Sequence, residues 1–332
     1  MRRRDEVASA ATPDPHIRAT LRAVGRCFGL GGRLREAATL GAGHIHDTYL
    51  VTYGDVGSRR RFVHQRINQR VFRDPVRLME NIERVTDHLY ASLVPDRAAS
   101  QIVRHVVTLL RAGDGRSYCI DDAGAYWRTY AYIEGACTHA TIDSPGLARD
   151  AAAAFGRFVR LLADLPGPRL HETLPHFHDS PWYMEQLRRT VEADVGRLAA
   201  SVRAELDFAF ENETIVHMLA SLPPDMLPER VVHNDTKIDN VLFDAASGKA
   251  LCVIDLDTVM PGSVLYDFGD LVRSAASASR EDARELDQVY LRLPIFEGLV
   301  QGYSDALLSL LTEEERDLLA LAGKLVAFEV GI

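Results

Sequence analysis

The stretch His233-Asn-Asp-Thr-Lys-Ile-Asp-Asn240, followed by Cys252-Val-Ile-Asp-Leu-Asp-Thr258, decides the fold of this chain. An H-x-D-x-x-x-x-N string supplies one carboxylate, Asp235, that can hold an attacking hydroxyl, and one amide oxygen, on Asn240, that can bind a metal ion. Asp255 adds a second oxygen ligand fifteen residues after Asn240. The pattern therefore predicts a phosphoryl-transfer site.

A β-hairpin is predicted between the two halves of this site. Val241–Asp244 and Ala250–Ile254 are short apolar runs separated by the turn Ala245–Lys249. Reflection about the turn places Asn240 opposite the end of the second strand, at or just before Asp255, and opposed residues in an antiparallel pair lie roughly 4.5–5.5 Å apart. An amide oxygen and a carboxylate would then converge on one point, which suits Mg²⁺.

Two further readings of this region remain open. Asp257, two residues beyond Asp255, would face the same side if the strand continued and could bind a second ion or a water. His, Asp and Asn beside turns are also common as helix caps or turn residues, and the returning hairpin is what favours a catalytic role.

Asp267-Phe-Gly269 spells the magnesium-binding tripeptide of protein kinases, but it follows the turn at Met260–Gly262. The strand before that turn already ends next to Asp255, which is the expected metal ligand. We therefore expect Asp267 to cap the next helix or to support the catalytic loop.

Four segments of the chain resemble those of one enzyme family, the N-acetylhexosamine 1-kinases, which belong to the aminoglycoside and choline phosphotransferase group. The segments are HNDTKIDNVLFD (233–244), CVIDLDTVMPGSVLYDFGD (252–270), QRINQRVFRDPVRLMENI (65–82) and HFHDSPWY (176–183). The resemblance runs from about Gly41 to the end of the chain. It implies an α+β, bilobal protein-kinase-like fold and ATP-dependent phosphorylation of the anomeric hydroxyl of a sugar such as N-acetylglucosamine, with Mg²⁺.

This resemblance and the spacing together give the catalytic residues their roles. Asp235 would accept or orient the proton of the acceptor hydroxyl, and Lys237 would neutralise charge on the transferring phosphoryl group. We expect His233 to brace the loop. His176 and His178 are expected in the loop or the substrate pocket rather than as metal ligands.

The residues that would hold the nucleotide phosphates match the known phosphate-binding patterns less closely than the catalytic loop does. The loop Leu40–Thr48 contains Gly41 and Gly43 but lacks a third glycine. The third strand has no lysine, so Arg66 is chosen as the phosphate-binding cation, with Gln65 as the inward residue if the register differs by one. The resemblance points to Glu80 as the acidic partner, although a helical wheel places it opposite the apolar stripe.

The aromatic strand Ala125–Ile133 would be the hinge that meets adenine. Its nucleotide candidates are Thr129, Tyr130, Tyr132 and Ile133, and the alternative is that their side chains fill a core. For the acceptor, polar groups with an aromatic wall are expected. The candidates are Asp270, Arg273, Phe177 and Tyr183, each of which could instead be a cap, a surface pair or a structural residue.

Hydrophobic patterning predicts three parts: a flexible tail at 1–14, a β-rich nucleotide-binding lobe at 15–135 with its hinge at about 129–135, and a helical lobe at 136–332. Helices are expected at His16–Phe28, Pro75–Tyr90, Leu147–Asp164, Pro181–Leu198, Arg203–Ser221, Val264–Ser277 and after Arg280. Strands are expected at Arg33–Leu40, Asp47–Tyr53, Arg61–Ile67, Ile102–Leu110, Ser117–Ile120 and Ala125–Ile133, besides the hairpin.

Composition favours a cytoplasmic enzyme with small-molecule partners. The net charge of -9 argues against nucleic acid or an anionic membrane as the main partner. No apolar run approaches the roughly 20 residues of a membrane span. The four dispersed cysteines include no C-x-x-C pair, so neither zinc nor a disulfide framework is expected. The sequence does not distinguish a monomer from a homodimer.

Three alternatives remain. The chain could phosphorylate another small alcohol, such as choline, homoserine or an aminoglycoside. It could be an inactive nucleotide-binding homologue, although Asp235, Asn240 and Asp255 are all present. The ending Phe328–Ile332, without a helix stop, could also mark a truncated chain with an incomplete acceptor pocket.

Overall fold

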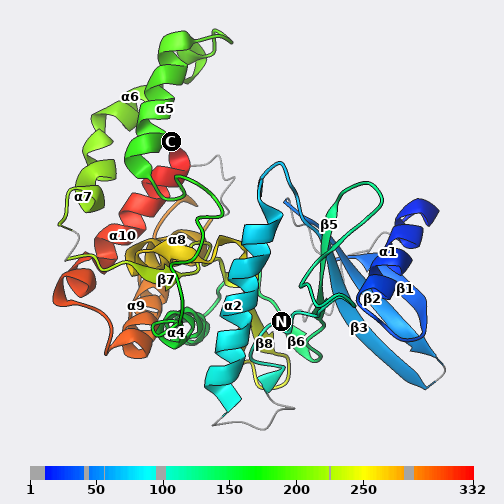
Figure 1. Ribbon diagram of the computed structural model, residues 1–332. Helices are drawn as coiled ribbons and strands as arrows, with labels where there is room; N and C mark the ends of the chain where they lie inside the picture. The colour runs from blue at the N-terminus through cyan, green and yellow to red at the C-terminus, as the bar shows by residue number, and fades with distance from the viewer. Residues whose placement is uncertain (1–11, 41–44, 56, 95–101, 224–225, 280–287) are drawn as a thin grey trace. The chain divides into compact units, whose positions relative to one another are not determined.

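The computed structural model describes residues 12–40, 45–55, 57–94, 102–223, 226–279 and 288–332. The chain forms two compact units. Unit 1 contains residues 1–137 and 242–257, and unit 2 contains residues 138–241 and 258–332. The predicted fold class is confirmed, because an antiparallel β lobe and a helical lobe are both present (Figure 1).

Unit 1 is built on a five-stranded antiparallel sheet in the order β1-β2-β3-β5-β4. Its strands are β1 (Arg33–Thr39), β2 (Asp47–Asp55), β3 (Ser58–Arg66), β4 (Cys119–Ile120) and β5 (Tyr126–Ala131). Register places Thr48 opposite Gln65, and Gln65 opposite Arg128. Because side chains alternate along a strand, these three residues form a row on one face of the sheet.

Helix α1 (Pro15–Cys27) covers the other face of this sheet (Figure 1). Leu21 and Val24 of the helix pack there with Val51, Phe62 and Trp127 in one apolar core. Asp14 caps the helix by accepting a hydrogen bond from the backbone of residue 17, and Pro15 suits its first turn. Helix α2 (Pro75–Leu93) is capped in the same way by Asp74.

A second sheet in unit 1, in the order β6-β8-β9, contains the predicted hairpin. It is formed by β6 (Ala136–Cys137), β8 (Val241–Asp244) and β9 (Ala250–Val253). The Asp244 amide donates to the Lys249 carbonyl at 2.8 Å and closes the turn. The turn is further held by the Asp244 carboxylate, which accepts from the Ser247 amide at 2.7 Å.

Unit 2 is mainly helical. Its α-helices are α4 (Pro145–Leu161), α5 (Ser180–Ala193), α6 (Arg203–Glu211), α7 (His217–Ala220), α8 (Val264–Ala275), α9 (Leu293–Leu307) and α10 (Glu313–Gly331). Helix α4 packs along α9, and α8 packs along α10. Glycine permits both close approaches: a Cβ on Gly302 of α9 would lie 2.2 Å from the Arg149 carbonyl oxygen, and one on Gly269 of α8 would lie 2.5 Å from the Ala322 carbonyl oxygen.

A short antiparallel pair in unit 2 frames the catalytic loop. Strand β7 (Arg230–Val232) pairs with β10 (Met260–Gly262), and residue 232 lies opposite residue 260. The predicted loop begins directly after β7. A 3₁₀ turn, η4 (Ile238–Asn240), ends it.

Two predicted elements are wrong. Residues 103–105 form a turn instead of a strand, because the amides of His105 and Val106 donate back to the Ile102 carbonyl, and Leu109 makes an isolated bridge to Tyr130. The helix expected over 203–221 is divided into α6, a 3₁₀ turn at Glu213–Val216 and α7.

Candidate active site

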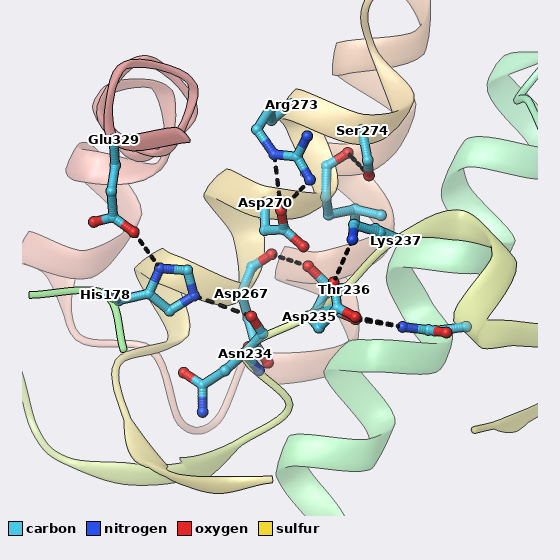
Figure 2. Close-up of polar contacts among 12 residues, drawn as sticks. His178, Asn234, Asp235, Thr236, Lys237, Asp267, Asp270, Arg273, Ser274 and Glu329 are labelled. Carbon is cyan, nitrogen blue, oxygen red and sulfur yellow. Dashed lines mark hydrogen bonds and ion pairs between the residues drawn. The ribbon is translucent and has the colours of Figure 1, made fainter. Parts of the chain in front are cut away.

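Asp267, on the first turn of α8, supports the catalytic loop of unit 2, which comprises residues 233–240. Its carboxylate accepts hydrogen bonds from the His233 amide at 3.0 Å and the Asn234 amide at 2.6 Å. The Thr236 hydroxyl donates to the Asp267 backbone carbonyl (Figure 2). Burial raises the pKa of Asp267 to about 6, against the opposing effect of the nearby His233 ring and the backbone donors.

All three residues of the Asp267-Phe-Gly269 tripeptide thus have structural roles. Asp267 is fully buried under the loop, Phe268 is fully buried in the core, and Gly269 allows the close approach of α10. The expectation that Asp267 supports the catalytic loop is confirmed by its hydrogen bonds.

His233 also has the bracing role that was predicted. Its ring is fully buried and packs edge-on against Phe155 and Phe158 of α4, at centroid distances of 5.4 and 5.7 Å. Its backbone carbonyl accepts a hydrogen bond from the Thr258 hydroxyl at 2.7 Å. The loop therefore leaves β7 from a rigid base.

Asp235, Lys237 and Asn240 lie close together in the catalytic loop. The Lys237 Nζ is 3.2 Å from an Asp235 carboxylate oxygen, and the two side chains are 42% and 26% exposed. Burial alone would lower the pKa of Lys237, but Asp235 and Asp270 raise it above its ordinary value, so this side chain stays cationic. A reactant can therefore reach a carboxylate that has a fixed positive charge beside it.

Asn240 is oriented by Asp235. Its amide nitrogen donates to the Asp235 backbone carbonyl at 2.9 Å and to the Asp235 Oδ2 at 3.1 Å. Since the amide oxygen occupies the other branch of the group, it faces away from Asp235. That orientation fits the predicted use of the oxygen as a metal ligand.

Asp255 and Asp257 of unit 1 differ sharply in their surroundings. Asp255 is exposed and has a left-handed backbone with φ 61°. Asp257 is buried: Arg128 binds both of its oxygens, with one of these contacts at 2.7 Å, and His46 Nε2 lies 2.7 Å from Oδ2. Asp255 is exposed to solvent, whereas the carboxylate of Asp257 is enclosed by the Arg128 guanidinium and the His46 ring.

The tautomer of His46 follows from its two partners. Its Nδ1 faces the Asn68 amide at 3.0 Å, and because an amide N–H only donates, Nδ1 must be the acceptor. Nε2 therefore carries the proton and donates to Asp257. Burial opposes ionisation of Asp257, but Arg128 and His46 outweigh it and hold the pKa of this carboxyl well below its usual range.

Arg128 is the buried cation that binds Asp257, and it was not identified from the sequence. Its Nε donates to Gln65 Oε1 at 2.9 Å, and Gln65 in turn donates to Thr48 at 3.0 Å. Arg66, which was chosen for the phosphate-binding role, is on the opposite face and pairs with Asp47 on β2. The structure thus agrees with the alternative register, in which Gln65 lies on the same face of the sheet as Arg128, the residue that binds Asp257.

Glu80 lies on an exposed side of α2, away from the buried Leu78 and Ile82. The ion-pair partner that the structure gives to Arg66 is Asp47. Gly41 and Gly43 lie outside the described residues.

The hinge candidates are divided between the two faces of β5. Thr129 is fully buried, and its hydroxyl lies 2.8 Å from His64 Nδ1 on the face covered by α1. Tyr130 shares the other face with Arg128, whose guanidinium lies 5.5 Å from its ring centroid. Tyr132 and Ile133 follow the strand and are half-buried, and the Tyr132 ring lies 4.2 Å from the Arg61 guanidinium.

Asp270 and Arg273 form a buried pair on α8 rather than a surface pair. Asp270 Oδ1 accepts from Arg273 Nε at 2.9 Å and from a terminal nitrogen at 2.7 Å. Among the described residues, Asp270 Oδ2 is buried and has no hydrogen-bond partner. Figure 2 shows Asp270 between Arg273 and the loop that carries Asp235 and Lys237.

The aromatic candidates belong to the segment that enters α5. Phe177 lines a hollow of about 240 Å³ together with Met260 and Pro261 of β10. Tyr183 is half-buried on the first turn of α5, and its ring centroid is 5.3 Å from that of Trp182. Burial, with Glu329 nearby, raises the pKa of Tyr183.

A β lobe and a helical lobe with an H-x-D-x-x-x-x-N loop define a phosphotransferase of protein-kinase-like fold. Residues 36–303 match the family model described as "Phosphotransferase enzyme family" (APH), and the chain belongs to this family. None of the described helices combines the length and apolar character needed to cross a membrane.

Three solved structures share the fold at low identity. A microcompartment-associated aminopropanol kinase is 19% identical, with 94% of each chain covered and a TM-score of 0.55. The AMP-bound complex of spectinomycin phosphotransferase is 12% identical, with 93% of this chain and 90% of that chain covered and a TM-score of 0.55. An ethanolamine kinase from Plasmodium vivax is 13% identical, with 94% and 78% covered and a TM-score of 0.54.

Proposed function

We propose that this protein is an ATP-dependent kinase that phosphorylates the anomeric hydroxyl of an N-acetylhexosamine to give the sugar 1-phosphate. The observation that carries the proposal is the arrangement of the catalytic loop. An accessible carboxylate, Asp235, lies 3.2 Å from the Lys237 ammonium, and the amide of Asn240 is fixed by hydrogen bonds to the same residue.

In this reaction Asp235 orients the acceptor hydroxyl and receives its proton. A bond forms between the hydroxyl oxygen and the γ-phosphorus, the bond from that phosphorus to the bridging oxygen breaks, and ADP leaves. Lys237 lies where it stabilises negative charge on the group in transfer. Positioning and electrostatic stabilisation account for most of the rate in such reactions.

The metal that this chemistry calls for is Mg²⁺, which would neutralise the nucleotide phosphates. The residues present fit it: Asn240 offers an amide oxygen turned away from its donor contacts, and Asp255 offers an exposed carboxylate. Asp257 does not fit a second site, because its two oxygens already accept from Arg128 and His46.

Asp270 is the residue that bears most directly on the chemical class of the acceptor. Asp270 Oδ2 is buried and has no hydrogen-bond partner among the described residues, and a sugar hydroxyl or a bound water would each satisfy it. Asp235 pairs with Lys237 and Asp270 pairs with Arg273, so the charges of these four groups sum to zero. A neutral, hydroxyl-rich acceptor suits this balance.

An amino alcohol is the second candidate, because the fold is shared with an aminopropanol kinase and an ethanolamine kinase. A cationic acceptor would need uncompensated negative charge near its ammonium group. Arg273 neutralises Asp270 and Lys237 neutralises Asp235, so the charge balance favours the sugar. The choice of N-acetylhexosamine within the sugars rests on the resemblance of the four sequence segments.

A coupled assay of ADP release tests the proposal. The purified protein, with ATP and Mg²⁺, is given N-acetylglucosamine, N-acetylgalactosamine, other free sugars, an aminoglycoside, choline, homoserine and ethanolamine. We expect turnover with the N-acetylhexosamines. Turnover with a non-sugar alcohol alone would overturn the substrate, and nucleotide binding without ADP release from any acceptor would indicate an inactive homologue.

The position of attack is tested with a sugar blocked at its anomeric oxygen. This compound should not be phosphorylated, because the proposed nucleophile is missing and no other hydroxyl would be in line with the γ-phosphate. Phosphorylation of the blocked sugar at its 6-hydroxyl would refute the 1-kinase assignment and leave Asp235 as the base.

A further inference from the structure

Both ring nitrogens of His178 bind oxygen atoms within unit 2. Nδ1 is 2.7 Å from Glu329 Oε1 on α10, and Nε2 is 3.0 Å from the backbone carbonyl oxygen of Asn234 (Figure 2). The His178 and Glu329 side chains are only 8% and 6% exposed. This pair therefore connects the C-terminal helix to the catalytic loop through a site closed to water.

The partners determine the protons on the ring. A carbonyl oxygen can only accept, so Nε2 must carry a hydrogen. Nδ1 faces a carboxylate whose other oxygen already accepts from the Ser180 hydroxyl. A ring that donates from both nitrogens is an imidazolium, and its charge is matched by the Glu329 carboxylate.

The surrounding groups favour that charge. Burial would lower the pKa of His178, but Glu329, the Asn234 carbonyl and Asp270 together raise it above its ordinary value. Asp267 of α8 also interacts electrostatically with the ring. On its face, the ring stacks on Tyr266 with centroids 4.8 Å apart.

The carbonyl that His178 binds belongs to the peptide that joins Asn234 to Asp235. Asn234 has φ 65°, a left-handed conformation that needs support from its surroundings. Its amide donates to Asp267, and its side chain donates to the Thr258 carbonyl at 2.9 Å. His178 supplies a further contact, on the carbonyl next to the catalytic carboxylate.

We infer that His178, kept doubly protonated by Glu329, is a positioning residue that sets the direction of Asp235 for phosphoryl transfer. The inference rests on the proposed function only in its effect on turnover. When the ring loses its Nδ1 proton at higher pH, a lone pair faces the Glu329 carboxylate. The contact then weakens and the loop relaxes.

His178→Asn and Glu329→Gln test the inference. Asparagine tolerates the φ of 61° that His178 adopts. His176→Asn is a matched control, because His176 is exposed, has the same φ of 61° and lies two residues earlier. Glu314→Gln is the control on the exposed side of α10.

His178→Asn should lower kcat by at least about tenfold while KM for ATP changes less than about twofold. In the unmutated protein, kcat should fall as pH rises through the ring's raised pKa. Glu329→Gln should remove that fall, because the glutamine amide can donate to Nδ1 of a neutral ring and Nε2 keeps its proton. Equal kcat in His178→Asn and His176→Asn, or the same pH profile in Glu329→Gln, would overturn the inference.

Two readouts do not depend on turnover. One histidine NMR signal should titrate above the ordinary range, be absent in His178→Asn and move to lower pH in Glu329→Gln. Amide hydrogen exchange over residues 233–240 should be faster in His178→Asn than in His176→Asn. If both hold and no acceptor is phosphorylated, the proposed function fails and the loop contact stands; if neither holds in an active enzyme, the inference alone is wrong.

Discussion

Arg128 and Asp257 form a buried bidentate ion pair whose side chains are 1% and 5% exposed. Asp257 is two residues after Asp255, whose backbone is left-handed at φ 61°. Within unit 1 this pair therefore anchors the segment that presents the exposed Asp255 carboxylate. The second acidic residue of the ID-x-D sequence is a structural anchor for the first.

Asp257→Asn should destabilise the protein by about 3–5 kcal/mol, because it leaves the Arg128 guanidinium buried without its counter-charge. Urea unfolding at constant pH measures this loss. Any rise in the magnesium concentration that gives half-maximal rate should accompany this loss of stability, because the anchor of Asp255 is weakened. A large rise in that concentration with unchanged stability would restore Asp257 as a metal ligand.

Asn240→Ala and Asp255→Ala should each remove most activity and weaken the dependence on magnesium, because each deletes an oxygen proposed to bind the ion. Initial rates across a magnesium titration measure both effects. Asp239→Ala is a matched control, since Asp239 is exposed on the same turn as Asn240.

Asp267→Asn should lower stability and leave the magnesium dependence unchanged; the reverse result would make Asp267 the ligand.

Asp235→Asn should keep nucleotide affinity nearly intact while kcat falls by about 10² or more, the scale for loss of a positioned base with its charge. Calorimetric titration with ADP and steady-state kinetics separate the two quantities. A variant that loses nucleotide binding as strongly as turnover would show that Asp235 acts on the nucleotide and not on the acceptor.

His64 makes unit 1 sensitive to acid. Its ring is fully buried between Thr129 and Tyr53, and burial lowers the pKa of His64 to about 3. A histidine with a lowered folded-state pKa contributes stability that is present above its unfolded value of about 6.5 and is lost as pH falls toward 3. The loss between pH 7 and pH 5 is about 2 kcal/mol.

His64→Gln should remove this part of the pH dependence, although the variant is expected to be less stable overall. Urea unfolding at pH 7 and at pH 5 gives the difference for each protein. His16→Gln, at an exposed position on α1, should retain the full difference. An equal difference in all three proteins would show that the buried ring does not resist protonation.

The catalytic loop and the hairpin could be predicted from the sequence because both are local. Apolar runs, turn residues and the spacing from Asp235 to Asn240 lie within one short stretch, and the structure forms β8 and β9 where the pattern places them. The roles of His233 and Asp267 also followed from this order of elements.

Arg128 could not be assigned in the same way, because its hydrogen-bond partners, Gln65 and Asp257, come from two other segments of the chain. A charged residue within the aromatic strand Tyr126–Ala131 was a usable signal, since a buried guanidinium requires a partner. The partner itself depends on the register of β3 and on the fold around Asp257. His178 and Glu329 are 151 residues apart, and no local pattern joins them.

The path of the chain through residues 242–257 limits how this protein can be divided. The chain leaves unit 2 after Val241, supplies two strands and Asp257 to unit 1, and returns at Thr258. A single cut near residue 137 would leave the C-terminal fragment carrying a piece of the other unit's sheet, and the N-terminal fragment would keep Arg128 without its counter-charge. No contiguous fragment that ends near residue 137 therefore contains all of unit 1.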